Sequence, residues 1–531
     1  KLYAQNIPDN FTGVHFRYDS NNNSFVSTNP KRSNQKSTPV ITIHHNNNVQ
    51  TGGSYIRYYF TEPYGVGYYS AESGNGLYSS VGWSLSNERI SLFGNLNSTA
   101  LWDFPTYAVL TDYTDISDLG GLISAGVGNY IYALNRAGGI PVLTFNVQSY
   151  NNGTAGFTQI TGRGDFLVGS SVRTDSSAIL GFNISSNVPD WHLTIPAELM
   201  AMKLSGNDSL LIANTYSRFW VINTYSGQVF YSGLINPSSN DGSQSVQGIS
   251  GDGSIIATIN YDGFLTVYNR NGNTYNQLWQ YQEQPGLFYN WMSSVDISYD
   301  GSMIAAGTLD FIADSTFDGK IKLFKTTNGA VPVWSYSGCG DQVSSVSFSK
   351  NGKILSAATW GNRYIGGPNL FVFKTTHPDS TPVFMLNSPG SFFNTEVSND
   401  GQTVIASGKA VHARINGHGG TFYNVFIDTS DAPFGIRKEN ETIPNSFELY
   451  QNYPNPFNPA TMILYQLPKA GVTKFSVFDM LGQEVKVLLN TYQQAGSYNI
   501  QFDAKDFPSG IYFYKIQSGD FSCTKKMTLI K

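Results

Sequence analysis

A short turn pattern recurs eight times along this chain, and it constrains the fold more than any other feature of the sequence. An apolar run is followed by Ser-x-Asp-Gly or a close relative, and then by another apolar run. The turns end at Gly76, Gly121, Asp165, Ser209, Gly253, Gly301, Gly352 and Gly401, at intervals of 45, 44, 44, 44, 48, 51 and 49 residues. Because Asp-Gly and Asn-Gly supply the positive φ angles of tight hairpins, the pattern predicts eight similar β-units.

Each unit contains four short runs in which apolar and polar residues alternate. In the sixth unit they read SSVDISY, SMIAAGT, KIKLFKT and VPVWSYS. Such alternation is typical of strands with one buried face. Four antiparallel strands in a repeat of this length indicate one blade of a β-propeller.

The two ends of the repeat region are expected to close the ring. The last unit lacks an obvious fourth strand, whereas Tyr55–Glu62 precedes the first full unit as an orphan strand. Pairing this strand with the last blade gives an eight-bladed propeller, and a seven-bladed ring is the alternative. The region resembles WD40 or quinoprotein-type propellers in general shape only, since regular Trp-Asp and Gly-His signatures are missing.

Three adjacent blades carry long loops between their second and third strands, at Leu309–Gly319, Trp360–Pro368 and Lys409–Gly420. In a propeller these loops share a face, and long loops on a rigid scaffold are where binding usually occurs. A loop elaboration without a ligand stays open as the alternative. The candidate ligand-binding residues are Trp360, Arg363, Tyr364, His412, Arg414 and His418.

The sequence offers little sign of a metal or of a catalytic centre. Asp310, Asp314 and Asp318 are a weak calcium candidate, because their spacing is not the alternate-residue pattern of a calcium-binding loop. No nucleophile-elbow, zinc-protease, phosphate-loop or haem-attachment motif occurs. We therefore expect a protein without cofactor and without enzymatic activity.

The composition favours an extracellular β-protein. Charged residues make up only 13% of the chain, and the net charge of -5 gives no basic surface for nucleic acid. No apolar run is long enough for a membrane-spanning helix. The two cysteines, Cys339 and Cys523, fall in different predicted domains, so no disulfide is expected.

The repeat ends near Asp428, and a second domain is predicted after it. Residues 447–531 contain six short β-runs separated by Gly or Pro turns, which suggests a small immunoglobulin-like sandwich. The expected all-β organisation has four parts: an Asn-rich arm at 1–54, a propeller at 55–430, a linker at 431–446 and the sandwich at 447–531.

The tail carries a set of motifs in order, among them LYQNYPNPFNPAT, VFDMLGQEV, SGIYFYKI and the terminal TKKMTLIK. In this respect it resembles the C-terminal sorting domains of type IX secretion substrates. The resemblance implies recognition by the type IX secretion machinery and delivery to the extracellular space or outer cell surface. The motif residues are Tyr453, Pro454, Asn455, Pro456, Phe457, Asn458, Pro459, Gly510, Lys525 and Lys526.

These observations lead to one expected function and two alternatives. We expect a non-enzymatic binding or self-assembling platform, for example in a surface filament or layer. The alternatives are a glycan-binding adhesin that uses Trp360 and Tyr364, and a secreted polysaccharide-degrading enzyme. Beyond the secretion machinery, the expected partners are further copies of this chain and surface glycans.

Overall fold

The computed structural model describes most of the chain outside its N-terminal region. Its described residues are 16–19, 24–27, 54–85, 88–106, 113–235, 247–283, 290–313, 316–364, 366–377, 379–429, 437–440, 444, 446–452, 455–469, 471–493, 495–505 and 507–530. They fall into two compact units, with Ile56–Ile427 in the first and the residues from Asp428 onward in the second. Of the predicted arm at 1–54, the described part contains the antiparallel pair β1 (Phe16–Asp19) and β2 (Ser24–Ser27), and Ser54.

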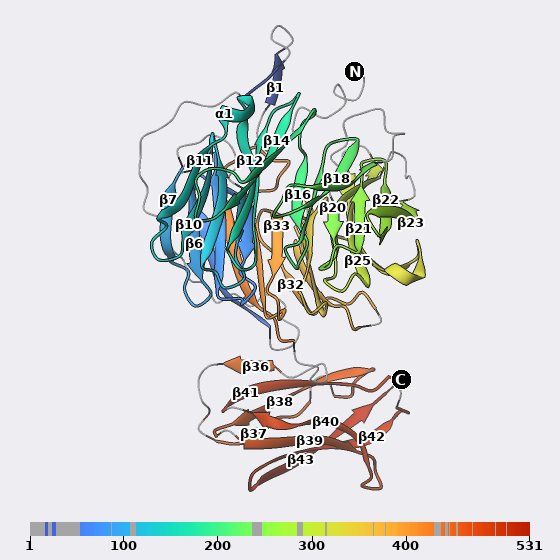
Figure 1. Ribbon diagram of the computed structural model, residues 1–531. Helices are drawn as coiled ribbons and strands as arrows, with labels where there is room; N and C mark the ends of the chain where they lie inside the picture. The colour runs from blue at the N-terminus through green and yellow to red at the C-terminus, as the bar shows by residue number, and fades with distance from the viewer. Residues whose placement is uncertain are drawn as a thin grey trace. The chain divides into compact units, whose positions relative to one another are not determined.

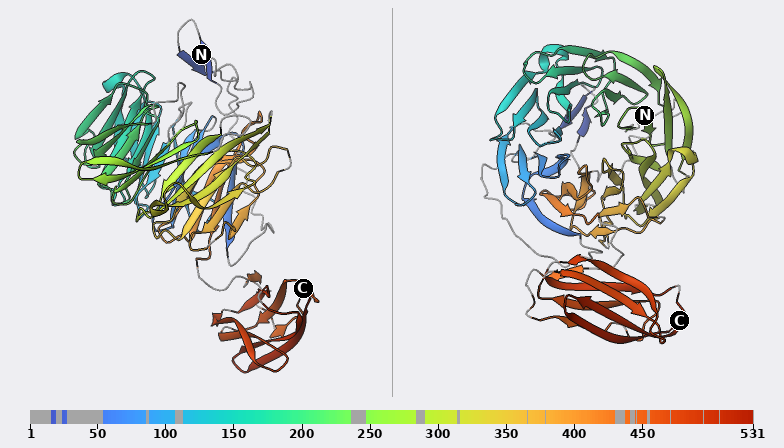
Figure 2. Two further views of the ribbon diagram at one scale, coloured as in Figure 1. Left: turned by 90° about the vertical axis from the view of Figure 1, so that its right-hand side faces the viewer. Right: turned by 60° about the horizontal axis from the view of Figure 1, so that its bottom comes forward.

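Eight four-stranded antiparallel sheets form the first unit, as predicted for an eight-bladed propeller. They follow one another around a closed ring (Figure 2, right). Blades one to four are β4 (Val66–Glu72), β5 (Tyr78–Ser84), β6 (Arg89–Gly94), β7 (Ala100–Pro105); β8 (Tyr113–Ile116), β9 (Leu122–Val127), β10 (Tyr130–Asn135), β11 (Pro141–Asn146); β12 (Thr154–Ile160), β13 (Phe166–Val172), β14 (Ser177–Asn183), β15 (Trp191–Ile195); and β16 (Ala201–Leu204), β17 (Leu210–Asn214), β18 (Arg218–Asn223), β19 (Val229–Leu234). A single helical turn, α1 (Gln148–Asn151), joins blades two and three.

The later blades repeat this order, with one extra hairpin strand in blade six. Blades five to seven are β20 (Gln247–Ile249), β21 (Ile255–Ile259), β22 (Phe264–Asn271), β23 (Thr274–Gln282); β24 (Trp291–Ile297), β25 (Met303–Ala313), β27 (Lys320–Lys325), β28 (Pro332–Ser337); and β29 (Val343–Phe348), β30 (Ile354–Thr359), β31 (Leu370–Lys374), β32 (Phe384–Leu386). The extra strand β26 (Thr316–Asp318) pairs with β25, and a 3-10 turn, η1 (Thr326–Asn328), follows β27.

The eighth blade is assembled from both ends of the repeat region. Its sheet has the order β3-β35-β34-β33, so β3 (Tyr55–Glu62) supplies the fourth strand beside β35 (Gly420–Phe426). The other two strands are β34 (Thr403–Lys409) and β33 (Ser391–Val397). In Figure 1 the blue start of the propeller accordingly lies beside its orange end.

Each recurring turn joins the first two strands of a blade through the same hydrogen bonds. In blade six, Ser298 Oγ accepts the N–H of Met303 at 2.9 Å and donates to Asp300, while the Gly301 N–H bonds the Ser298 carbonyl. All eight turns repeat the bond from the N–H five residues on to a Ser or Thr hydroxyl.

The structure corrects the predicted register of three turns. The positive-φ residue is Gly120, Gly164 and Asp208, not the following residue in each case. In blade four a non-glycine residue, Asp208, adopts φ 65°. The positive-φ residues of the eight turns are therefore 76, 120, 164, 208, 253, 301, 352 and 401. The first four are evenly spaced along the chain.

We expect the Ser298→Ala substitution to lower the free energy of unfolding by about 1–3 kcal/mol, because it leaves the Met303 N–H without its acceptor. Ser298 is fully buried. Ser302→Ala is the matched control, since its exposed hydroxyl also donates to Asp300 and its loss should have little effect. Chemical denaturation of both variants measures the difference, and equal effects would contradict this role of the turn hydroxyl.

The propeller core lies between neighbouring blades. Ala257 and Val267 of blade five, for example, pack with Met292 and Ile304 of blade six in one buried cluster. Similar clusters join the other blades, so each sheet buries one face on the next. No helix in the described part of the chain is long and apolar enough to cross a membrane.

The second unit is a two-sheet sandwich. One sheet has the order β36-β41-β38-β37 and the other the order β40-β39-β42-β43. Tyr465 and Ile500 of the first sheet share a buried core with Phe475 and Tyr514 of the second. The strands are β36 (Arg437–Asn440), β37 (Glu448–Leu449), β38 (Ala460–Leu467), β39 (Gly471–Phe478), β40 (Glu484–Gln493), β41 (Gly496–Asp503), β42 (Gly510–Ser518) and β43 (Phe521–Leu529).

The proline-rich motif of the tail holds the last strand in place. Phe457 is buried, its N–H donates to the Thr528 carbonyl, and the Ile530 N–H donates back to its carbonyl, both at 3.0 Å. Asn455 accepts the Thr528 N–H at 2.9 Å. Among the other motif residues, Gly510 begins β42 and Lys525 and Lys526 lie on β43, while Tyr453 and Pro454 lie outside the described residues.

Candidate functional site

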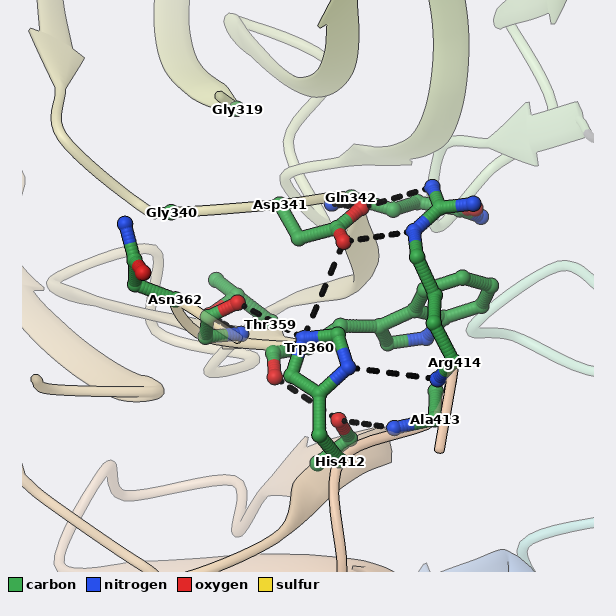
Figure 3. A network of polar contacts seen from close by, with 12 residues as sticks. Gly319, Gly340, Asp341, Gln342, Thr359, Trp360, Asn362, His412, Ala413 and Arg414 are labelled. Carbon is green, nitrogen blue, oxygen red and sulfur yellow. Dashed lines mark hydrogen bonds and ion pairs between the residues drawn. The ribbon is translucent and has the colours of Figure 1, made fainter. Parts of the chain in front are cut away.

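The structure brings together three of the six predicted loop residues. Trp360, His412 and Arg414 converge on the buried carboxylate of Asp341, which lies between blades six and seven (Figure 3). Trp360 comes from the long loop of blade seven, and His412 and Arg414 come from that of blade eight. The cluster therefore ties three consecutive blades together at the face that carries the long loops.

Arg414 and Asp341 form the centre of this cluster. The guanidinium donates from Nε to Asp341 Oδ2 at 2.7 Å and from Nη2 to Oδ1 at 2.9 Å. It also lies over the Phe317 ring at 3.8 Å and the Trp360 ring at 5.1 Å. This two-point geometry gives a fixed orientation, and the aromatic faces cover the cation.

His412 is neutral in this arrangement. Its Nε2–H donates to the Gly361 carbonyl at 3.0 Å, and its Nδ1 accepts the Arg414 backbone N–H at 3.2 Å. Burial lowers the pKa of His412 below its ordinary value, although the Gly361 carbonyl and Asp341 oppose the shift. Both ring nitrogens of His412 are therefore occupied by contacts within the protein. We interpret Trp360, His412, Arg414 and Asp341 as a structural cluster that braces neighbouring blades against one another.

The other three predicted residues make none of the hydrogen bonds or ring contacts given above for this cluster, although the charge of Arg363 contributes to the lowered pKa of His412. Tyr364 is 68% exposed, and the Arg363 guanidinium lies over its ring at 5.6 Å. His418 stacks on Tyr64 at 5.8 Å. As ligand contacts, these three residues remain predictions.

The weak calcium candidate has other partners where it is described. Asp310 is buried and accepts from Lys320 at 2.5 Å, and Asp318 accepts the backbone N–H groups of Gly338 and Gly340 at 3.0 and 2.9 Å. Asp314 lies outside the described residues. Among the residues that the structure describes, no group of three or more His, Cys, Asp or Glu is arranged to hold a metal ion. The described free thiols are Cys339 and Cys523.

A cavity of about 1170 Å³ lies among the innermost strands of the propeller. Its wall contains seven aromatic side chains, and the six other than Tyr130 form what we call the aromatic arc. Two groups of rings within it are in contact: Tyr69, Tyr113 and Phe157 at 4.0 and 4.3 Å, and Tyr68, Phe393 and Trp360 at 5.0 and 6.1 Å. The arc is made of Tyr68, Tyr69, Tyr113, Phe157, Trp360 and Phe393.

The arc follows from the repeat. Tyr69, Tyr113 and Phe157 each lie four residues before the turn Ser or Thr of blades one, two and three, so successive blades place their rings next to one another. The Tyr69 hydroxyl donates to that of Tyr113 at 2.9 Å. All three rings are half-buried. None of the arc residues except Phe157 belongs to a blade-to-blade core cluster among the described residues.

A second set of equivalent residues lies two positions before the turn. At this position Asp115 accepts the N–H of Ile160 in the next blade at 2.9 Å, and Glu396 accepts that of Glu72 at 2.8 Å. Gln159 and Asp296 make the same bond to Leu204 and Phe348. The polar side chain thus joins inner strands of neighbouring blades. The whole set is Ala71, Asp115, Gln159, Lys203, Gly248, Asp296, Ser347 and Glu396.

Lys203, the residue two positions before the turn in blade four, forms an ion pair that skips one blade. Its Nζ lies 2.5 Å from Asp296 Oδ1, which joins blade four to blade six. Blade five has Gly248 at this position, where an added Cβ would lie 2.9 Å from Ile297 Cγ1. Burial alone would lower the pKa of Lys203, but the ion pair raises it above its ordinary value.

Two carboxylates at this level have strongly perturbed acidity. Burial raises the pKa of Asp115 to about 7 and that of Glu396 to about 8. Asp118 and Asp208 add to the shift of Asp115, and Asp115 adds to that of Glu396, against the opposing charge of Lys203. Burial likewise raises the pKa of Glu198 on the cavity wall and that of Glu72 behind it.

These shifts predict how stability depends on pH. Between the ordinary carboxyl pKa of about 4 and the raised values, the folded protein binds more protons than the unfolded chain, so stability falls as pH rises. The double variant with Asp115→Asn and Glu396→Gln lacks both titrating carboxyls. We therefore expect its free energy of unfolding to fall less than that of the parent protein between about pH 5 and about pH 8. Denaturant titrations across this range measure the slopes, and parallel slopes would contradict the prediction.

The sequence could have pointed to these residues. Asp115, Asp296 and Glu396 are charged residues within otherwise apolar or β-branched runs, TDIS, VDIS and TEVS, each two residues before a turn Ser. A charged residue at one fixed position in several repeats indicates the channel wall. The long loops drew the prediction to the face of the propeller, and of its six residues only Trp360 lines the cavity.

Comparison with known families identifies the second unit. Residues 451–531 match the secretion system C-terminal sorting domain, which confirms the resemblance found from the motifs. This domain implies export by type IX secretion to the cell surface or the extracellular space, and it implies contact with the secretion machinery. No curated protein matches the chain.

Comparison with solved structures supports the propeller. The structure of Sqt1 from Saccharomyces cerevisiae matches with a TM-score of 0.51 and 12% identity, covering 69% of this chain and 97% of that chain. The β-propeller domain of Cps50 (Swd1) from Myceliophteria thermophila gives a TM-score of 0.44 and 10% identity, covering 60% and 99%. At such identities the likeness to Sqt1 concerns the fold alone.

Proposed function

We propose that this exported protein is a non-enzymatic binding protein that holds its ligand against the aromatic arc in the propeller channel. The observation that carries the proposal is the arc itself: rings from consecutive blades, half-buried except for the buried Trp360, on one wall of a cavity of about 1170 Å³. Aromatic walls with a few converging polar groups are characteristic of ligand sites. Rings needed only for blade packing would belong to the clusters between the sheets, and most of the arc does not.

The same wall supports binding better than catalysis. Asp115 and Glu396 have raised pKa values, as acid–base catalysts often do. Each, however, accepts a backbone N–H from the next blade, as Gln159 does at the equivalent position. A structural role common to the repeat accounts for them. Adhesion to glycans through Trp360 and Tyr364, and self-assembly into a surface filament or layer, remain predictions.

The proposal is tested by screening the full chain against a panel of soluble glycans and small metabolites. We expect at least one compound to bind, to be recovered chemically unchanged, and to bind at least about tenfold more weakly to Tyr113→Leu and Phe157→Leu, which lose a flat ring but keep an apolar side chain. Tyr364→Leu is the matched control on the exposed loop, and it should bind like the parent protein.

Two results would overturn the proposal. One is a panel in which no compound binds. The other is a ligand whose affinity falls in Tyr364→Leu while the two channel variants bind normally, which would place binding on the loop and favour the adhesin. Conversion of a bound compound to product would favour the enzyme instead.

A further inference from the structure

The cavity wall carries an excess of negative charge. Among the described residues that line it, the charged side chains are Asp115, Glu198, Glu396 and Lys203. Lys203 is already paired with Asp296, which lies just behind the wall. The three remaining carboxylates therefore have no basic side chain of their own on this wall.

Backbone N–H groups supply the hydrogen bonds that Asp115 and Glu396 accept, and the charge of Lys203, which is paired with Asp296, offsets that of Glu396 in part. Asp115 accepts the backbone N–H groups of Ile116 and Ile160, both at 2.9 Å. Glu396 accepts the N–H of Glu72 at 2.8 Å. Backbone dipoles compensate a buried anion partly, and the raised pKa values of Asp115 and Glu396 show that the ionised forms remain costly. A positive charge in the cavity would remove that cost.

The aromatic arc suits the same kind of charge. The faces of Tyr and Trp rings attract cations, most strongly where water is excluded. Tyr69 on β4 and Tyr113 on β8 each lie two residues before the position that Asp115 occupies in blade two, and Asp115 follows Tyr113 on the same face of β8. The cavity thus combines ring faces with carboxylates, and an anionic ligand would be repelled by both.

On these grounds we propose that the channel site takes a small organic ammonium ion, with its apolar part against the aromatic arc and its charge toward Asp115 and Glu396. This inference rests on the proposed binding function and adds the chemical class of the ligand. A neutral sugar could stack on the rings of the aromatic arc, but it would bring no positive charge to the carboxylates.

Binding of a permanent cation must then depend on the protonation of the wall. Asp115 faces Asp118, Asp208, Glu396 and Lys203, and Glu396 faces Lys203, Asp296, Glu72 and Asp115. A cation favours the ionised carboxylates, so its affinity should rise as pH increases through about 7 to 8 and fall at lower pH, with proton release on binding. A neutral ligand of the same shape should show no such rise.

The experiment compares two cations with their uncharged isosteres, using the full chain and isothermal titration calorimetry. Choline is matched with 3,3-dimethyl-1-butanol, and putrescine with 1,4-butanediol. We expect each cation to bind at least about tenfold more tightly than its partner at about pH 8. Choline keeps its charge at every pH, so its affinity should fall at least about fivefold toward pH 6.

Variants locate the charge that is recognised. Asp115→Asn and Glu396→Gln keep an acceptor oxygen for the backbone N–H, and each should weaken choline binding and flatten its pH dependence. Glu448→Gln, at an exposed carboxylate of the second unit, is the control and should change neither. The pH dependence of the parent protein tests the proposal even where a channel variant does not fold.

The outcomes separate the two proposals. If neither cation binds up to about 10 mM, or if the isosteres bind as tightly, the ammonium class is wrong. The binding function then stands or falls with the broader panel and the Tyr113→Leu variant. The inference would also be overturned if the affinity for choline changed neither with pH nor in the Asp115→Asn and Glu396→Gln variants.

Discussion

Replacing Asp341 by Ala is expected to lower the free energy of unfolding of the propeller by about 3–5 kcal/mol, because it removes the carboxylate that pairs with the buried Arg414 guanidinium. The Arg414 side chain is only 10% exposed, and its two hydrogen bonds to Asp341 hold it between the Phe317 and Trp360 rings. With the carboxylate gone, the guanidinium must either stay buried without these two hydrogen bonds or pull the blade-eight loop away from blades six and seven.

The double variant Asp341→Leu, Arg414→Met separates charge from packing. Replacing a buried pair by apolar side chains is often nearly neutral, so the double variant should be more stable than Asp341→Ala. Asp175→Ala is the control for an ion pair on the surface: Asp175 bonds Arg173 at 2.8 Å with both side chains well exposed, and no measurable change is expected. Denaturant unfolding compares all three, and equal stability of Asp341→Ala and Asp175→Ala would show that the cluster does not brace the blades.

This brace gives a structural account of three residues that the sequence analysis predicted as ligand contacts. Arg414, His412 and Trp360 are the residue types that bind ligands, and they lie on the longest loops of a propeller. Their partner Asp341 belongs to a connection between blades with no motif of its own. Only the folded ring shows that Asp341 meets Arg414, 73 residues further along the chain.

The repeat, in contrast, made the architecture predictable. The eight turns depend on local chemistry, a Ser or Thr hydroxyl and a positive-φ residue, and local chemistry can be read from the sequence. The cavity wall depends on register: Tyr113 and Asp115 reach the channel because they lie four and two residues before Ser117. A misplacement of one residue in blades two to four, as in the predicted turns, hides that correspondence.

The second large effect is expected from the strand that closes the ring. Phe60→Ala in β3 should lower the free energy of unfolding by about 3–5 kcal/mol, since it leaves a cavity in a buried aromatic cluster. The Phe60 ring lies 5.4 Å from those of Trp83 and Phe93, in blade one. Leu101→Ala in β7, an outer strand that leaves Leu101 52% exposed, is the control and should change little.

Removal of β3 as a whole tests closure itself. Arg57 on this strand donates to Thr403 and Asn424 of blade eight at 2.8 and 3.1 Å, so the strand joins blade eight to the start of the chain. A chain that lacks residues 54–62 should lose cooperative unfolding. Blade eight then has an unpaired edge, and no strand from the start of the repeat region pairs with it to close the ring. Moving the same residues to a position after Asp428 should restore cooperativity. The sheet requires β3 to pair with β35, and this pairing does not depend on where β3 stands in the sequence. If the deletion unfolds as cooperatively as the parent protein, contacts between blades one and eight suffice to close the ring, and the strand only covers an edge.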